Sequence, residues 1–118
     1  MAWEVVPKKN NVETFISINR NHVVFNTGTV RTYDLKKYKS VILLVDDDKK
    51  KIGFKFSANP KEDLNSFSLT SCNNYLTLYT KKLTLGRDWL QKLLLLPASD
   101  RRFTPSYDTE EELLTITI

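Results

Sequence analysis

Few residues in this chain belong to the types that perform catalysis. The chain has 118 residues, with one histidine, His22, and one cysteine, Cys72. A general base or a nucleophile needs a partner that takes or shares its proton. His22 has no carboxylate or thiol nearby in the sequence, and Cys72 has no cationic neighbour. The sequence therefore predicts that the protein is not an enzyme, with His22 in a strand beside a turn and Cys72 filling a loop or strand.

Two acidic triplets, residues 46–48 and 110–112, are the remaining candidates for chemistry. Carboxylate oxygens bind divalent cations. Three consecutive carboxylates in a turn point in different directions, however, and residues 49–51 after the first triplet are all lysine. With three glycines in the whole chain, no phosphate-binding loop is present. We expect two hairpin turns here, with no metal and no cofactor.

Positive charge is the feature of the composition that points to a partner. Lys and Arg number 18 against 14 Asp and Glu, a formal net charge of +4, and the excess lies in the first half of the chain. Because Lys and Arg displace counterions from a phosphate backbone, this balance favours a nucleic-acid partner. Tyr75 and Tyr79, with Lys81 and Lys82, could also form a stacking platform for single strands, unless that face of the strand is core.

Apolar alternation and turn residues predict the elements that carry these side chains. We expect a single domain over residues 1–118, in which two halves, about 13–57 and 66–118, are joined by a linker at about 58–65. The clearest element is a hairpin that pairs residues 39–45 with 52–56. The other expected strands cover residues 13–18, 22–25, 66–70, 75–79, 81–85, 102–107 and 113–118, and the expected short helices cover 27–35, capped by Asn26 or Thr27, and 86–94. The expected core residues are Leu43, Val45, Ile52, Phe54, Phe56, Trp89, Leu90, Leu93, Ile116 and Ile118.

The two halves show a faint internal similarity at an offset of about sixty residues, which can fix an architecture. Val30, Tyr33 and Leu35 align with Leu90, Leu93 and Leu95. After a short insertion, Val41, Val45, Asp46, Ile52, Phe54 and Phe56 align with Phe103, Tyr107, Asp108, Leu114, Ile116 and Ile118. We therefore predict an α+β fold of mostly antiparallel β-structure, with two short helices and pseudo-two-fold duplicated halves.

Each half has the same order of elements. A strand is followed by a short helix that ends at a leucine, and then by a hairpin with an acidic turn. The last strand of the hairpin has the sequence Ile-x-Phe or Leu-x-Ile. This order resembles the swapped-hairpin DNA-binding proteins of the AbrB class over residues 15–56 and 76–118. The Ile-Pro that usually starts the helix in that class is replaced by Phe25-Asn26 and Leu85-Gly86. Members of the class form dimers in which the two copies interdigitate. The resemblance therefore implies that the two halves of this chain pair with each other as a built-in pseudo-dimer. On that basis we expect the whole chain to be a monomer or a weak homodimer.

The resemblance also implies that basic residues around the strand–helix junctions contact double-stranded DNA. In this chain those positions are Arg20, His22 and Arg31 in the first half and Lys81, Lys82, Arg87 and Lys92 in the second. Lys36, Lys37 and Lys39 follow the first helix and extend this cluster, although cations there also compensate a helix dipole. Because of its charge, the first half is expected to supply most phosphate contacts.

These observations predict a non-enzymatic DNA-binding regulator of phage, plasmid or antitoxin type. The alternative is a protein-interaction module, such as a small inhibitor or accessory subunit, that docks a partner at Phe15, Tyr107 and a free edge strand near Pro105. The start of the chain lacks the basic and then apolar residues of a leader, and its longest aliphatic run, residues 41–45, is too short to span a bilayer. We therefore expect a cytoplasmic protein without a membrane partner.

Overall fold

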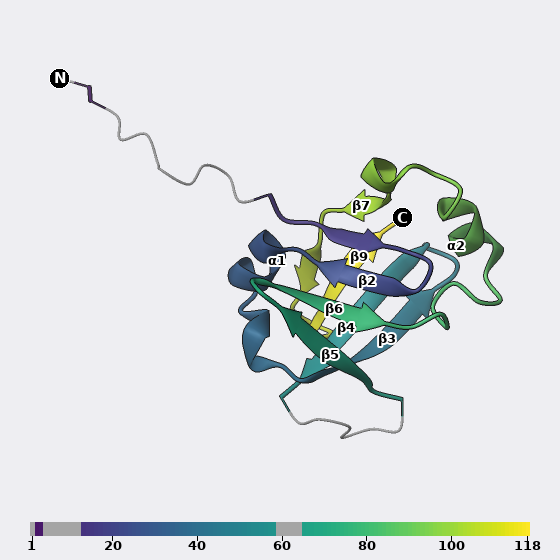
Figure 1. Ribbon diagram of the computed structural model, residues 1–118, viewed down its shortest axis with the longest axis horizontal. Helices are drawn as coiled ribbons and strands as arrows, with labels where there is room; N and C mark the ends of the chain where they lie inside the picture. Colours follow the sequence, from purple (N-terminus) through teal and green to yellow (C-terminus); the bar gives the residue numbers. More distant parts are fainter. Residues whose placement is uncertain (1, 4–12, 59–64) are drawn as a thin grey trace.

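Antiparallel β-strands dominate the computed structural model, which describes residues 2–3, 13–58 and 65–118 (Figure 1). Most of the expected linker, residues 59–64, lies outside the described residues. The strands are β1 (Ile16–Ile18), β2 (His22–Phe25), β3 (Ser40–Asp46), β4 (Lys51–Ser57), β5 (Phe67–Cys72), β6 (Tyr75–Tyr79), β7 (Arg102–Phe103), β8 (Ser106–Asp108) and β9 (Leu113–Thr117). The helices are α1 (Thr27–Thr32) and α2 (Asp88–Leu93), with 3-10 turns η1 (Leu35–Lys37) and η2 (Ala98–Arg101).

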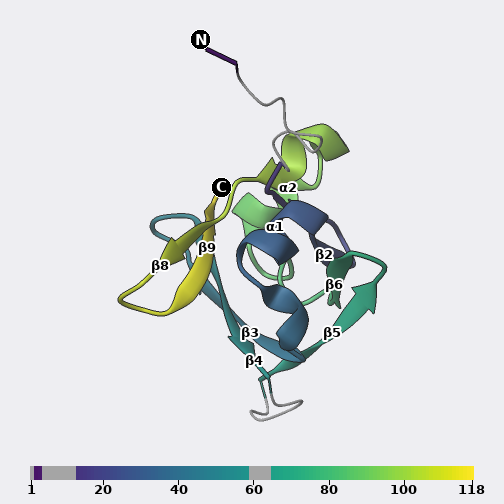
Figure 2. The ribbon, with the colours of Figure 1, turned by 90° about the vertical axis from the view of Figure 1, so that its left-hand side faces the viewer.

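All nine strands belong to one curled sheet, in the order β7-β1-β2-β6-β5-β3-β4-β9-β8. Its two outer strands, β7 and β8, are separated in the chain only by Thr104 and Pro105, so the sheet must curl until its edges meet. Figure 2 shows β8, β9, β4 and β3 forming one wall and β2, β6 and β5 the other. The predicted single strand over residues 102–107 is therefore divided in two. Pro105, which has no N–H to donate to a ladder, lies at the break.

Hairpins and long-range pairings alternate around this sheet. β1 pairs with β2, β3 with β4, β5 with β6 and β8 with β9, each antiparallel. The two halves are joined where β2 pairs with β6 and β4 with β9. Two further contacts are short, since β3 meets β5 only at Ser40 and Val41, and β1 meets β7 only at Ile16 and Ser17. The predicted hairpin of residues 39–45 and 52–56 is confirmed as β3 and β4.

Both helices are short, at six residues each, and they lie at opposite ends of the curled sheet (Figures 1 and 2). Asn26 caps α1 as predicted, because its Oδ1 accepts from the Thr29 backbone N–H at 2.9 Å. The predicted helix over residues 27–35 ends early, at Thr32, and Leu35 belongs to η1. Of the described residues, none forms a helix long and apolar enough to cross a membrane.

The helix α2 begins two residues later than predicted. Gly86 has a φ of 78°, a left-handed conformation that glycine adopts without strain and that cannot be part of the helix. Arg87 is the N-cap residue but contributes no side-chain hydrogen bond, and Asp88 is the first helical residue. On this helix Leu90 and Leu93 are buried, whereas Trp89 is half-buried.

The core lies inside the curl and centres on three phenylalanine rings. Phe25 meets Phe54 at 5.1 Å and Phe56 at 5.4 Å between ring centroids, both edge to face. Five expected core residues are buried: Ile52, Phe54, Leu90, Leu93 and Ile116. The other five, Leu43, Val45, Phe56, Trp89 and Ile118, are only partly buried against this cluster.

The predicted strand over residues 81–85 is wrong. This segment forms a series of turns after β6, although Leu83 and Thr84 are buried. Leu85 is 62% exposed. The alternation of apolar residues indicated correctly that Leu83 is buried. It indicated a strand wrongly, since no described strand pairs with residues 81–85.

Candidate nucleic-acid interface

A hollow of about 720 Å³ beside α2 brings together cations from both halves of the chain. Arg20 comes from the turn between β1 and β2, Lys81 follows β6, and Lys92 lies on α2. The pairing of β2 with β6 explains the first two positions. His22 lies opposite Tyr79, and the Thr80 backbone N–H donates to the Asn21 carbonyl at 3.0 Å. The antiparallel ladder therefore continues toward Arg20 on one strand and Lys81 on the other.

Among the described residues, these three cations have no counterion of their own. Arg20, Lys81 and Lys92 are exposed, and none forms an ion pair with the residues that the structure describes. One carboxylate, Asp88, lines the same hollow. Its single negative charge leaves an excess of positive charge around the hollow, which is the arrangement that attracts an anionic ligand.

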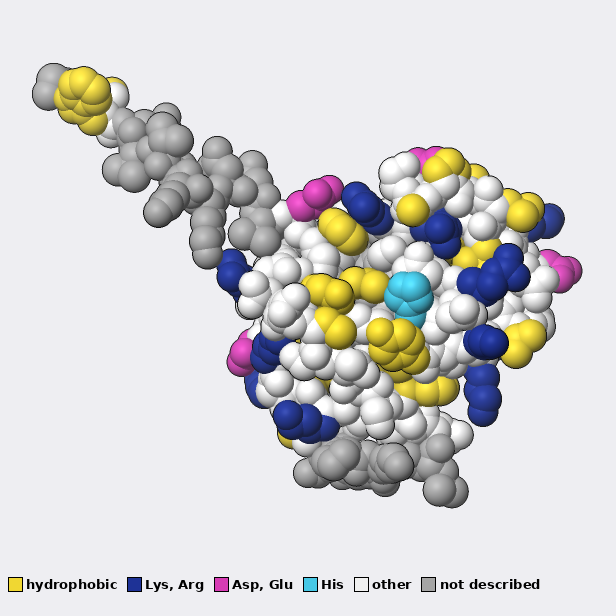
Figure 3. Space-filling view, viewed as in Figure 1, with side chains coloured by type: hydrophobic (Ala, Val, Ile, Leu, Met, Phe, Trp, Pro, Cys, Tyr) yellow, Lys and Arg dark blue, Asp and Glu magenta, His cyan; other side chains and the backbone are white. Residues whose placement is uncertain are grey.

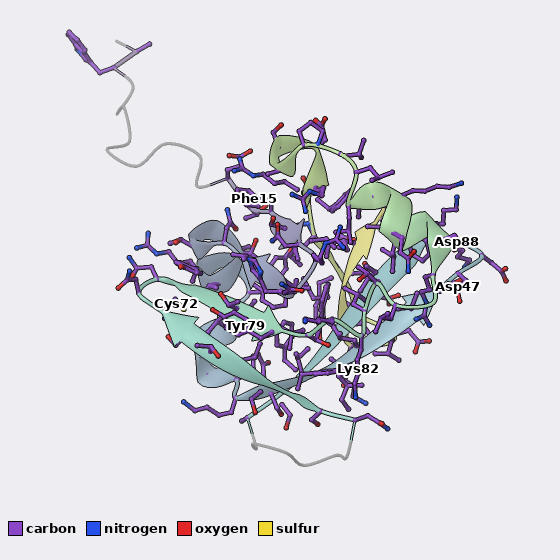
Figure 4. The ribbon with its side chains drawn as sticks, turned by 45° about the vertical axis from the view of Figure 1, so that its right-hand side comes forward. Phe15, Asp47, Cys72, Tyr79, Lys82 and Asp88 are labelled. Atoms are coloured by element: carbon purple, nitrogen blue, oxygen red, sulfur yellow. The ribbon has the colours of Figure 1, made fainter. Side chains whose placement is uncertain are left out.

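Two rings lie on the sheet next to the hollow. The His22 and Tyr79 ring centroids are 6.0 Å apart and tilted by 37°, and Tyr79 is 61% exposed. Figure 3 shows the histidine in the middle of one face, with several basic side chains to its right and others toward the left edge. Tyr79 projects from β6 on this face, and Asp88 marks the position of α2 (Figure 4). The face thus combines an exposed ring, Tyr79, and a half-buried ring, His22, with cations that form no ion pair with a described residue.

Two more of the predicted DNA-contacting residues lie near this hollow but line a separate groove. Lys82 and Arg87 border a groove beside β3. The Arg87 Nε donates to Asp47 Oδ1 at 3.2 Å, so its charge is already compensated within the chain. Lys82 is exposed and forms no ion pair with a described residue.

The predicted residues around α1 lie at the other end of the sheet. The Lys36 Nζ donates to Ser71 Oγ and to the Asn73 carbonyl, both at 2.7 Å. Lys37 forms an ion pair with Asp34 at 3.6 Å and lies 5.2 Å from the Tyr38 ring centroid. Arg31 and Lys39 are exposed. The structure thus brings together Arg20, Lys81 and Lys92, with His22 nearby, but does not bring Arg31, Lys36, Lys37 or Lys39 to the same hollow.

Sequence reasoning missed the apolar part of the hollow. Leu85 and Leu95 line it and are 62% and 82% exposed. The internal alignment placed Leu95 opposite Leu35, which is 2% exposed, so equivalent positions in the two halves have opposite environments. The available signal was the run of four leucines at residues 93–96, because four consecutive side chains point in different directions and cannot all face one core.

The part of the chain that the structure describes contains no cluster of metal-ligating side chains. There, no group of three His, Cys, Asp or Glu side chains lies close enough to hold a metal ion. Cys72, at the end of β5, is half-buried (Figure 4).

Comparison with protein-family models, with curated protein sequences and with solved structures finds no match.

Proposed function

We propose that this chain is a non-enzymatic DNA-binding protein that contacts the phosphate backbone at the hollow between Arg20, Lys81 and Lys92. The observation that carries the proposal is that all three cations line one hollow, are exposed and have no counterion among the described residues, with Arg20 and Lys81 brought together by the pairing of β2 with β6. Each cation that neutralises a phosphate releases condensed counterions, which is the main source of affinity in sequence-independent binding.

The neighbouring rings suit the same ligand. An imidazole and a phenol can donate hydrogen bonds to phosphate oxygens, and such contacts position a protein along the backbone. His22 and Tyr79 lie on adjacent strands beside Arg20 and Lys81. The contact surface we propose therefore runs from the hollow onto the outer face of β2 and β6.

The strand pairings support a second part of the proposal, that the chain is a duplicated pseudo-dimer resembling the AbrB class. In this comparison β1 corresponds to β5, β2 to β6 and β4 to β9, and β3 corresponds to the broken pair β7 and β8. Each strand pairing in one half then has a counterpart in the other half. β3 with β5 then corresponds to β7 with β1. The joins between halves, β2 with β6 and β4 with β9, each unite equivalent strands, as a two-fold axis requires. On this basis we propose a regulator of phage, plasmid or antitoxin type.

Titration of a labelled duplex with the full chain at two salt concentrations tests the proposal. With three phosphate contacts, the logarithm of the association constant should fall with the logarithm of salt concentration with a slope of about −3. A single strand of the same sequence should bind more weakly if the duplex is the ligand. Absence of duplex binding at low salt, or an affinity that does not change with salt, would refute the proposed function.

A further inference from the structure

One edge of β3 has no partner strand among the described residues. On one side β3 pairs with β4 along its whole length, from Ser40 to Asp46. On the other side its pairing with β5 stops after Ser40 and Val41. Among the described residues, residues 42–46 therefore form an open edge within the sheet, in addition to the outer edges of β7 and β8. Such an edge is a template for another strand.

The direction of the backbone groups on this edge follows from the neighbouring ladder. The Ile118 N–H donates to the Lys50 carbonyl, so even-numbered residues of β4 point their backbone groups toward β9 and odd-numbered residues toward β3. In the register of β3 with β4, even residues of β3 consequently face β4. The backbone N–H and C=O groups of Leu43 and Val45 are thus the ones directed to the open edge.

A groove of about 610 Å³ follows this edge. Its β3 wall contains the alternating side chains of residues 42–45, of which Leu44 is 42% exposed. Phe67 and Leu83 add apolar surface, and Lys82 supplies positive charge, whereas Arg87 is paired with Asp47. The open edge itself carries no charged residue between Ser40 and Asp46, although exposed edges of soluble proteins are usually protected by charge or proline.

We infer that this groove binds an extended segment of a partner protein, which adds a strand to the open edge of β3. The backbone groups of Leu43 and Val45 would supply the hydrogen bonds of the added strand. Alternate side chains of the partner would pack on Leu43 and Phe67, which point to the same face of the sheet because Val41 pairs with Phe67. Its carboxylates would face Lys82, whose charge is uncompensated among the described residues. The partner segment is therefore aliphatic at alternate positions and acidic between them. This inference uses no residue of the proposed DNA contact.

Amide hydrogen exchange on the unliganded full chain tests the open edge first. The amides of Leu43 and Val45 should exchange at least about tenfold faster than those of Ile42 and Leu44, which donate to β4. Slow exchange at all four amides in dilute protein would overturn the inference, because the edge would already be covered. Protection that grows with protein concentration would also overturn it, because the occupant would then be a second copy of the chain.

A displayed library of eight-residue peptides that alternate acidic and aliphatic residues is the probe for binding. The full chain should enrich peptides that slow exchange at Leu43 and Val45. N-methylation of the peptide amides that face β3 should weaken binding by about tenfold or more, whereas N-methylation of the intervening amides should have little effect. Failure to enrich any peptide, or equal effects of both N-methylated sets, would refute strand addition.

Charge reversal at the groove gives a matched pair of variants. Lys82→Glu should weaken binding of the selected acidic peptide by at least about fivefold, and Lys49→Glu, an exposed lysine in the turn between β3 and β4, should not. Equal losses in the two variants would show that net charge, and not the groove, attracts the peptide, and would overturn the acidic part of the inference. Duplex binding and binding of the N-methylated peptides are both measured on the unchanged chain, so failure of this inference and failure of the proposed function can be told apart.

Discussion

The Trp89 indole N–H donates to Asp47 Oδ1 at 2.9 Å, and this bond ties α2 to the turn that follows β3. The same oxygen accepts from the Arg87 Nε at 3.2 Å. Figure 4 shows Asp47 and Asp88 close together at this end of the molecule. One carboxylate thus holds the start of a six-residue helix that is too short to be stable alone. The acidic segment that was predicted only as a hairpin turn therefore has a structural role.

Asp47→Ala should consequently lower the free energy of unfolding by about 1 kcal/mol, because it removes two hydrogen bonds at a partly exposed site. Urea denaturation followed by circular dichroism measures the change. Asp48→Ala is the matched control, since Asp48 is exposed in the same turn and forms no hydrogen bond with a described residue. Equal changes in both variants would contradict the role of Asp47.

Asn26 connects the first strand to the first helix. Its Oδ1 accepts from the Phe15 N–H at 3.0 Å and from the Thr29 N–H and hydroxyl at 2.9 and 2.7 Å, and its Nδ2 donates to the Glu13 carbonyl at 2.6 Å. Asn26→Ala should lower the free energy of unfolding by about 2 kcal/mol, more than loss of an ordinary cap, because the Phe15 N–H also loses its acceptor. Asn26→Asp keeps the acceptor and should recover at least half of that loss in urea denaturation. A loss below about 0.5 kcal/mol in Asn26→Ala would contradict this account.

Burial distinguishes two neighbouring residues of α2. Leu90 is fully buried, whereas Trp89 is half-buried and bonded to Asp47. Leu90→Ala should therefore cost about 2–5 kcal/mol of unfolding free energy. Trp89→Phe keeps the apolar contact and loses one hydrogen bond, so it should cost about 1 kcal/mol. Thermal or urea unfolding in which Trp89→Phe is the more damaging change would show that the indole, and not Leu90, anchors the helix.

Local features of this fold were readable from the sequence. The alternation in residues 52–56, beside a buried run and an Asp-Lys turn, predicts the hairpin of β3 and β4, and Asn26 is one of the two predicted caps of the first helix. Non-local features were not. Leu83 is buried without belonging to a strand, and Trp89 is held by a residue 42 positions away. Alternation and helical spacing indicate which side chains are buried, but not which segment covers them.

The candidate site has the same non-local origin. Arg20 and Lys81 meet only because β2 pairs with β6, a contact between strands more than fifty residues apart in sequence. Charge distribution alone pointed to the first half, where Lys36 and Lys37 are in fact engaged by Ser71, Asn73 and Asp34. Counting charges along a chain cannot show which of them are already compensated.

The grouping of cations leads to the last prediction. Replacing Arg20 and Lys81 together by Ala should weaken binding to duplex DNA and make the salt slope shallower by about two units, because two phosphate contacts are lost. Arg31 and Lys39 form the matched control, since their replacement removes the same charges from exposed positions at the other end of the sheet. Anisotropy titrations of a labelled duplex at several salt concentrations measure both slopes. If the Arg31 and Lys39 variant loses as much slope as the Arg20 and Lys81 variant, the hollow beside α2 is not where DNA binds.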